Sequence, residues 1–341
     1  MPTNTSPEYK QAEEAYRKAR EPRERLTCLR ELLRTIPKHK GTEHLQADIK
    51  TRIKHLTEEL AGPKKGGGRS GPTHVIRHEG AAQICLLGPP NAGKSSLHAA
   101  WTGSRTEIGP YPYTTHHPVP GMLPFEGIHF QLVDLPPISA DFMEPWLPAA
   151  LQPADGLLLV IDLADPECLE QIPAIIDRLA ERKVHPRSSW PGQPAAGGKG
   201  LSPDAVEDPF RLDLPTLLVA NKADLDPDPD EVAVLEELLG LRFPALTTSA
   251  TTGQGLDQLG PFLFRALQIV RVFTKTPGKP PEADKPFAVF QGGTVRDVAR
   301  LVHQDIARDL QFARVWGAEV FDGQQVGPDH VVADGDVVEL H

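Results

Sequence analysis

Gly88–Ser96 reads GPPNAGKSS and follows the apolar run AAQICLL at residues 81–87. An apolar strand leading into G-x-x-x-x-G-K-[ST] is the context in which this pattern forms a phosphate-binding loop. Gly88 and Gly93 would let backbone N–H groups wrap a phosphate with no Cβ in the way. Lys94 would neutralise the β- and γ-oxygens, and Ser95 would offer its hydroxyl to magnesium. The stretch therefore predicts a nucleotide-phosphate site at the end of a buried strand.

A second motif indicates which base the site would read. NKAD, residues 221–224, follows the apolar run PTLLVA. At a strand end Asn221 and Asp224 can face a purine edge, and a carboxylate that accepts two N–H bonds suits guanine N1 and N2. Adenine lacks that pair of donors and would leave Asp224 unpaired, at a cost of about 1–3 kcal/mol. The motif therefore predicts guanine specificity.

Two further matches occur in the order that such a site requires. Ser249 and Ala250 follow FPALTT, where a backbone N–H could reach the guanine O6. Asp134 ends the strand-like segment IHFQLVD, and we expect it to hold magnesium through water. Each match alone could be a polar loop or a capping residue, but together they predict a guanine-nucleotide site.

With these residues in place, the chain resembles the Obg/DRG type of translation-associated GTPases, the latter being the developmentally regulated GTP-binding proteins. A TGS-like tail and a helical leader like that of the DRG proteins extend the resemblance over nearly the whole chain. The matching segments are GPPNAGKSS, YPYTT (Tyr111–Thr115), NKAD, the Ser249-Ala250 pair, IPKHKGTEHLQADIK (Ile36–Lys50), RVFTKTPGKPP (Arg271–Pro281), TVRDVARLVHQDI (Thr294–Ile306), FARVWG (Phe312–Gly317) and VGPDHVVADGDVVEL (Val326–Leu340).

The resemblance implies a fold, cofactors and partners. The expected fold is α/β, a P-loop GTPase with a doubly wound, mainly parallel sheet, an N-terminal helical hairpin and a C-terminal β-grasp TGS domain. Magnesium is the expected cofactor, and potassium is a second candidate. The expected partners are GTP or GDP and the ribosome or its RNA, an accessory protein being a further candidate.

The same resemblance assigns roles to individual residues. Thr115 is the expected magnesium ligand from switch one and, with Lys94, the expected catalytic residue. Asn91 occupies the position that helps hold a monovalent cation in related potassium-stimulated GTPases, although a turn residue chosen for its backbone is the alternative. The expected magnesium ligands are Ser95, Thr115 and Asp134, the last through water. The predicted nucleotide-binding residues are Gly88, Asn91, Ala92, Gly93, Lys94, Ser95, Ser96, Asn221, Lys222, Asp224, Ser249 and Ala250.

Pro and Gly punctuation divides the chain into three parts. Residues 1–72 are predicted to form the helical leader, broken at residues 37–41, and a flexible linker at Gly62–Pro72. Residues 73–271 are predicted to form the G domain, because short apolar runs alternate there with helical patterns such as those at residues 168–183 and 229–240. An exposed Pro/Gly-rich insertion is expected at about residues 185–213. Residues 272–341 are predicted to form the TGS domain.

One departure from the family bears on mechanism. Where these GTPases have D-x-P-G, this chain has Asp134-Leu135-Pro136-Pro137, and proline has no N–H to offer the γ-phosphate. Slow GTP hydrolysis is therefore expected. Two alternatives stay open: a guanine-nucleotide-binding module without effective hydrolysis or switching, and an interaction protein that works through its TGS domain and is stabilised by nucleotide. For His116 and His117 a solvated loop is favoured over a catalytic role.

Composition places the chain in the cytoplasm and away from the membrane. It has 341 residues, 3 cysteines without metal or redox spacing, and no apolar run of membrane-spanning length. Residues 1–80 carry 17 Lys and Arg against 11 Asp and Glu, although the net charge of the whole chain is −10. This asymmetry fits either an ordinary solvated helical surface or a contact with RNA phosphates.

Overall fold

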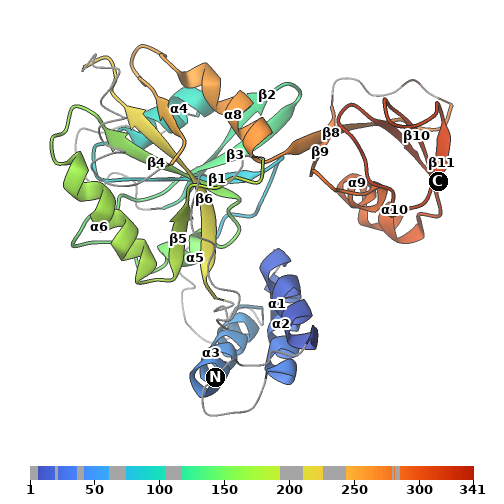
Figure 1. The fold of residues 1–341 in the computed structure, drawn as a ribbon, viewed down its shortest axis with the longest axis horizontal. Coiled ribbons are helices and arrows are strands. Elements are labelled where there is room, and N and C mark those ends of the chain that lie inside the picture. Colours follow the sequence, from blue (N-terminus) through green and yellow to red (C-terminus); the bar gives the residue numbers. More distant parts are fainter. Residues whose placement is uncertain are drawn as a thin grey trace, which may run out of the picture.

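The computed structural model describes residues 7–19, 22–36, 42–60, 74–104, 117–192, 210–225, 243–278, 280 and 285–341. Figure 1 shows a central body of sheet and helices, the N-terminal helices below it and a small C-terminal sheet to its right. None of the helices in these ranges is long and apolar enough to cross a membrane.

The central body is built on a mainly parallel sheet of seven strands. Its order is β2-β3-β1-β4-β6-β5, with β7 also paired to β6, and only β2 runs antiparallel to its neighbour. The carboxyl ends of the parallel strands therefore meet at one edge, where ligands bind in open α/β sheets. The strands are β1 Gln83–Leu87, β2 Val119–Phe125, β3 Ile128–Asp134, β4 Gly156–Asp162, β5 Val184–Arg187, β6 Leu212–Asn221 and β7 Ala245–Thr247.

Helices cover both faces of this sheet, which explains why its central strands β1 and β4 are buried and mostly apolar. Successive side chains of a strand point to opposite faces. In β1, Ile84 and Leu86 lie in the core that includes α4 (Lys94–Thr102) and α8 (Leu259–Ala266), which follows the short 3-10 helix Leu256–Gln258. Cys85 and Leu87 lie in the other core, with α5 (Leu147–Ala150) and α6 (Cys168–Ala180). The doubly wound fold predicted from the sequence is confirmed.

Where it is described, the N-terminal part forms three helices, α1 (Pro7–Lys18), α2 (Pro22–Thr35) and α3 (Glu43–Leu60). The predicted break at residues 37–41 falls between α2 and α3, although those five residues lie outside the described part. The first arm of the expected hairpin is divided into α1 and α2 near Pro22. A proline is favoured at the first helical position and disfavoured within a helix. Pro22 begins α2. Tyr9 and Tyr16 of α1 are buried in one cluster with Leu29 and Leu32 of α2.

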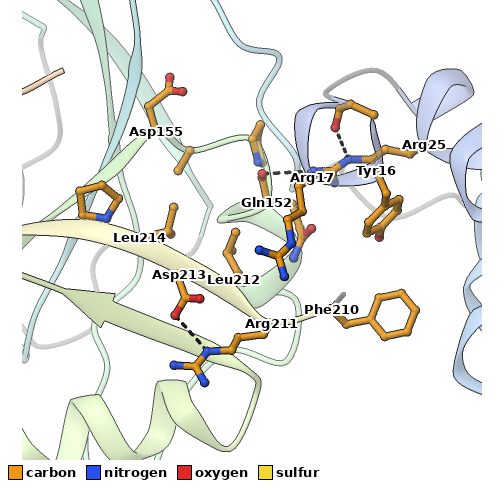
Figure 2. Close-up of a pocket in the computed structure, with 14 residues that line it drawn as sticks. Tyr16, Arg17, Arg25, Gln152, Asp155, Phe210, Arg211, Leu212, Asp213 and Leu214 are labelled. Atoms are coloured by element: carbon orange, nitrogen blue, oxygen red, sulfur yellow. Dashed lines mark hydrogen bonds and ion pairs between the residues drawn. The ribbon is translucent and has the colours of Figure 1, made fainter. Parts of the chain in front are cut away.

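Phe210, just before β6, joins the N-terminal helices to the central body. It is buried in the helical cluster, meets the ring of Tyr16 edge-on at 6.0 Å, and lies 3.8 Å below the guanidinium of Arg52. From α2, Arg25 donates to the carbonyl of Gln152 in the central body at 3.2 Å. A cavity of 320 Å³ lies at this junction, and Figure 2 shows arginines from both parts around it.

The sequence predicts an exposed insertion at about residues 185–213, and this prediction is wrong at both ends of the range. β5 extends to Arg187, and β6 begins at Leu212. Trp190 is buried against Gly156 and Phe262, and Phe210 is buried among the N-terminal helices. These positions escaped prediction because their partners are distant in sequence. Residues 193–209, and the helical pattern at 229–240, lie outside the described part.

The C-terminal part is a mixed five-stranded sheet of order β11-β10-β12-β8-β9 with two short helices on it, an arrangement consistent with a TGS domain. A capping box between Thr294 and Asp297 starts α9, and the extended backbone of His303 separates α9 from α10. The elements are β8 Ile269–Thr274, β9 Phe287–Phe290, α9 Val295–Val302, α10 Gln304–Asp309, β10 Ala313–Trp316, β11 Gln324–Val326 and β12 Val337–Leu340.

β8 connects this part to the central body without an intervening loop. Ile269, its first residue, is buried in the central core, whereas Val270 and Val272 lie in the C-terminal core. Between the two cores Arg271 forms ion pairs with Asp334 at 2.7 Å and with Glu126, in the turn between β2 and β3, at 2.5 Å. The strand and the arginine together hold the C-terminal sheet on the central body.

Candidate functional site

The loop between β1 and α4 requires glycine at both of its ends. Gly88 has a φ of 152°, and a Cβ there would lie 2.1 Å from the carbonyl oxygen of Val160. Gly93 has a φ of 88°, and a Cβ there would lie 2.2 Å from Nδ2 of Asn221. Side chains cannot enter either space, so both glycines are needed for the loop to pass so close to β4 and β6.

Three further residues of the predicted site lie on this loop or in the first turn of α4. Asn91 is exposed with a φ of 61°, a left-handed conformation that asparagine tolerates, which agrees with the turn-residue alternative. Ala92 is fully buried, and Ser96 is half-buried in the first turn of α4. Nucleotide or potassium binding by these residues stays a prediction.

Lys94, the first residue of α4, folds back over the loop. Its ammonium donates to the carbonyls of Gly88 at 3.1 Å and Pro89 at 2.7 Å. Burial lowers the pKa of Lys94 to about 8, although the negative charge of Asp134 opposes that shift. A buried ammonium that donates to two neutral carbonyls is well suited to pair with an anion in the loop.

Ser95 and Asp134 bring two oxygen ligands together. The Ser95 hydroxyl donates to Oδ2 of Asp134 at 2.5 Å, across the gap between α4 and the end of β3, and Asp134 is fully buried. Magnesium prefers such hard oxygen donors and is usually held by one or two protein groups, water and substrate phosphates. The two residues therefore fit magnesium. Thr115, the third expected ligand, lies outside the described residues, as do Thr114 and His116.

The segment after Asp134 is packed into the core beside the phosphate loop. Leu135, Pro136, Pro137 and Ile138 are all buried. The Ile138 N–H donates to the Gly88 carbonyl at 3.1 Å, and the Ile138 side chain lies in the core that contains α5 and α6. The first N–H after Pro137 is thus already directed at the phosphate loop.

Asn221, at the end of β6, connects the phosphate loop to the segment after β7. Its amide donates to the carbonyl of Ala92 at 2.9 Å, and its side-chain oxygen accepts the N–H of Ala250 at 3.3 Å. One buried side chain therefore sets the spacing between the predicted phosphate and base contacts.

Asp224 and Ser249 form the predicted base edge. The Ser249 hydroxyl donates to Oδ1 of the exposed Asp224 at 2.5 Å, and Ser249 itself is fully buried. The same Ser249 oxygen accepts the N–H of Thr252 at 3.1 Å. The structure thus brings together the predicted residues from the loops after β1, β3, β6 and β7 that it describes.

Sequence reasoning missed Asp162, the last residue of β4. Its carboxylate accepts from the ammonium of Lys222 at 2.5 Å, and in the sheet Asp162 is paired with Asn221. The signal that identified Asp134, an acid ending a buried apolar run, is also present in LLLVID and would have found it.

An aromatic stack links three segments that are distant in the sequence. His74 stacks on Trp146, the residue before α5, with ring centroids 4.1 Å apart. His117 in turn stacks on His74, with ring centroids 5.6 Å apart. His117 is exposed, in agreement with the solvated loop favoured from the sequence, and it also takes part in this stack.

Comparisons with known proteins give two family matches and several similar chains. Residues 83–187 match the family described as 50S ribosome-binding GTPase, and residues 270–341 match the TGS domain. An uncharacterized GTP-binding protein of Methanocaldococcus jannaschii is 26% identical over 93% of this chain and 92% of its own. Developmentally-regulated GTP-binding protein 1 of Xenopus laevis is 27% identical over 91% of this chain and 96% of its own. A solved GTP binding protein of Pyrococcus horikoshii OT3 covers 76% of this chain and 99% of its own, with 16% identity and a TM-score of 0.47.

The two family matches and the relatives lead to one assignment, which agrees with the resemblance seen in the sequence. The chain combines a GTPase domain of the family described as 50S ribosome-binding GTPase with a TGS domain, and it is distantly homologous to the DRG proteins over most of its length.

Proposed function

We propose that this protein binds GTP and GDP with magnesium, hydrolyses GTP slowly, and acts on the ribosome or its RNA. The observation that carries the nucleotide part is the pair of hydrogen bonds made by Asn221, to Ala92 at 2.9 Å and from Ala250 at 3.3 Å. These bonds hold a phosphate loop and a base loop at a fixed separation before any ligand arrives, and preorganisation of this kind favours binding.

In this proposal each residue has a separate task. Lys94 exchanges its two carbonyl contacts for phosphate oxygens, and Asp224 accepts hydrogen bonds from the guanine edge, assisted by the N–H of Ala250. Ser95 and Asp134 would hold magnesium, together with Thr115. The ion, when bound, would neutralise charge that develops on the phosphate oxygens. Lys94 adds a fixed positive charge to the same region, so the proposed catalysis is positioning and electrostatic stabilisation.

Slow hydrolysis follows from the segment after Asp134. Pro137 has no N–H, and the N–H of Ile138 is bonded to Gly88. The apolar Ile138 also cannot orient a water molecule. The same observation favours a second candidate function, a guanine-nucleotide-binding module that neither hydrolyses nor switches effectively.

The partner part of the proposal rests on different features. The matched family is named for 50S ribosome binding, the N-terminal region is basic, and the TGS match spans residues 270–341. We also propose the boundaries expected from the sequence, with a leader at 1–72, a G domain at 73–271 and a TGS domain at 272–341. A ribosomal role agrees with the cytoplasmic setting expected from composition.

Competition binding followed by a single-turnover assay tests this function. Unlabelled GDP should displace a fluorescent guanine nucleotide at least a hundredfold better than ADP, a difference of about 3 kcal/mol. Asp224→Asn should shift the preference toward xanthine nucleotides, and Lys94→Ala should weaken binding or abolish turnover while the domain stays folded. Equal displacement by ADP and GDP would contradict the guanine assignment.

Single-turnover hydrolysis in potassium and in sodium, with and without ribosomes, separates the two candidates. The proposed GTPase shows slow turnover that ribosomes accelerate, whereas the binding module shows none under any of these conditions. Co-sedimentation with ribosomes, compared with and without nucleotide, tests the partner.

A further inference from the structure

The turn that carries the predicted guanine contacts is held in an uncommon backbone conformation. Lys222 has a φ of 63°, in the left-handed region that residues with a Cβ seldom adopt. The N–H of Leu225 donates to the Lys222 carbonyl at 2.9 Å, which closes the turn. Because of this left-handed residue, Asn221 faces the phosphate loop while Asp224, three residues later, meets Ser249.

Asp162 is placed to stabilise that conformation. It ends β4 directly beside Asn221, its pairing partner in β6, and its Oδ2 lies 2.5 Å from the Lys222 ammonium. The side chain of Asp162 is 13% exposed and that of Lys222 is 32% exposed, so water screens this ion pair less than a surface pair.

The rest of the Asp162 environment keeps its carboxylate in place. Oδ1 accepts the N–H of Ala164 at 3.0 Å, and the next residue, Leu163, donates its N–H to the carbonyl of Asn221 at 3.1 Å. A carboxylate fixed by the sheet and by its own loop can therefore fix the lysine of the neighbouring loop.

We propose that Asp162 is a positioning residue for guanine recognition: by pairing with Lys222 it holds the left-handed turn that aims the Asp224 carboxylate at the base. The inference rests on the proposed guanine binding and adds to it a residue that does not touch the nucleotide. Its consequence is specific. Asp224 would accept a hydrogen bond from the guanine 2-amino group. Loss of the ion pair should therefore impair recognition of that group more than binding of the phosphates.

The experiment measures the ratio of affinities for GDP and IDP, because IDP lacks the 2-amino group but has the same ribose and phosphates. Asp162→Asn keeps an acceptor for Ala164 and removes the charge, so it should lower the GDP/IDP ratio about fivefold, as should Asp162→Ala. The matched control is Asp165→Ala, which removes a carboxylate from the same loop. Asp165 accepts from Glu167 at 2.9 Å and from Gln171 at 3.0 Å and should leave the ratio within twofold of wild type.

A second pair of variants isolates the backbone conformation. Lys222→Gly and Lys222→Ala both remove the ion pair. Only glycine adopts the left-handed conformation without steric cost, because it has no Cβ. Lys222→Gly should therefore retain most of the GDP/IDP ratio, whereas Lys222→Ala should lower it about fivefold. In the Lys222→Gly background, Asp162→Asn should have no further effect. Any contact between the lysine and the ribose affects GDP and IDP equally and leaves the ratio unchanged.

Several outcomes would overturn the inference. These are an unchanged ratio in both Asp162 variants, a loss in Asp162→Ala alone, which would place the effect at Ala164, or equal losses in Lys222→Gly and Lys222→Ala. Melting temperatures of all variants are measured in parallel, and the two Lys222 variants provide the test if those at Asp162 fail to fold. Failure of the proposed function is a different result, since the wild-type protein would then not distinguish GDP from ADP.

Discussion

At the scale of single residues, Lys94 illustrates how the fold prepares a charge for a ligand. Its ammonium is buried against two carbonyls, and burial lowers its pKa to about 8 from a usual value of 10.5. Between these two pH values the unfolded chain holds a proton that the folded chain lacks. The contribution of Lys94 to the free energy of unfolding therefore rises with pH between about 8 and 10.5. It is lost as the pH falls through about 8.

Nucleotide binding should therefore take up a proton above pH 8. A phosphate beside Lys94 favours the charged ammonium, so the bound lysine is protonated where the unbound one is not. Titration calorimetry of GDP binding with magnesium, in buffers of different ionisation heat, gives the number of protons taken up. We expect roughly half a proton per GDP near pH 8 and almost none at pH 6.5. Absence of uptake at pH 8 to 8.5 would contradict the expected change in Lys94 protonation on binding.

At the scale of elements, the segment from Asp134 to Ile138 departs from the family's D-x-P-G sequence and is packed into the core. Pro136 and Pro137 are buried, and Ile138 bonds to Gly88. Wild-type protein should consequently bind GDP and a nonhydrolysable GTP analogue with similar affinity. Pro137→Gly restores one N–H, worth about 1.5–3 kcal/mol if aligned, against an ordering cost of about 1 kcal/mol.

The expected net result of Pro137→Gly is a selective gain for the GTP analogue of roughly tenfold, or a faster potassium-stimulated rate, together with a lower melting temperature. Paired binding curves and single-turnover rates in potassium and sodium measure both effects. Brisk hydrolysis by the wild-type protein that the substitution leaves unchanged would mean that another group contacts the γ-phosphate.

Prediction from sequence succeeded where the signal was local. The apolar runs that end in Asp134 and Asn221 became buried parallel strands, and strand ends in such a sheet must share an edge. It failed where the partner was distant. Nothing near Trp190 or Phe210 reveals that Gly156 or Tyr16 will cover them, and a Pro/Gly-rich neighbourhood suggested exposure instead. The Asp162–Lys222 pair was missed for a second reason, because it depends on the pairing of β4 with β6.

At the scale of the whole molecule, the TGS-matched sheet is attached firmly to the G domain. β8 passes from one core to the other, and Ala288 and Phe290 of β9 pack on the central core. Arg271 adds ion pairs to both sides. The predicted nucleotide ligands all lie outside this C-terminal part, so its contributions to stability and to nucleotide binding are separable.

A chain that ends at Arg271 should show that separation. Its affinity for GDP with magnesium should stay within about threefold of the full chain, because every predicted phosphate and guanine contact remains. Its melting temperature should fall by roughly 3–8 °C, because the central core loses the cover of Ala288 and Phe290. Ribosome co-sedimentation should be lost. The matched control is full-length Arg271→Ala, which breaks the ion pairs yet keeps the C-terminal surface and should still sediment with ribosomes. If the shortened chain bound ribosomes as well as the full one, the basic N-terminal helices would be the contact, and the TGS match would have to serve another partner.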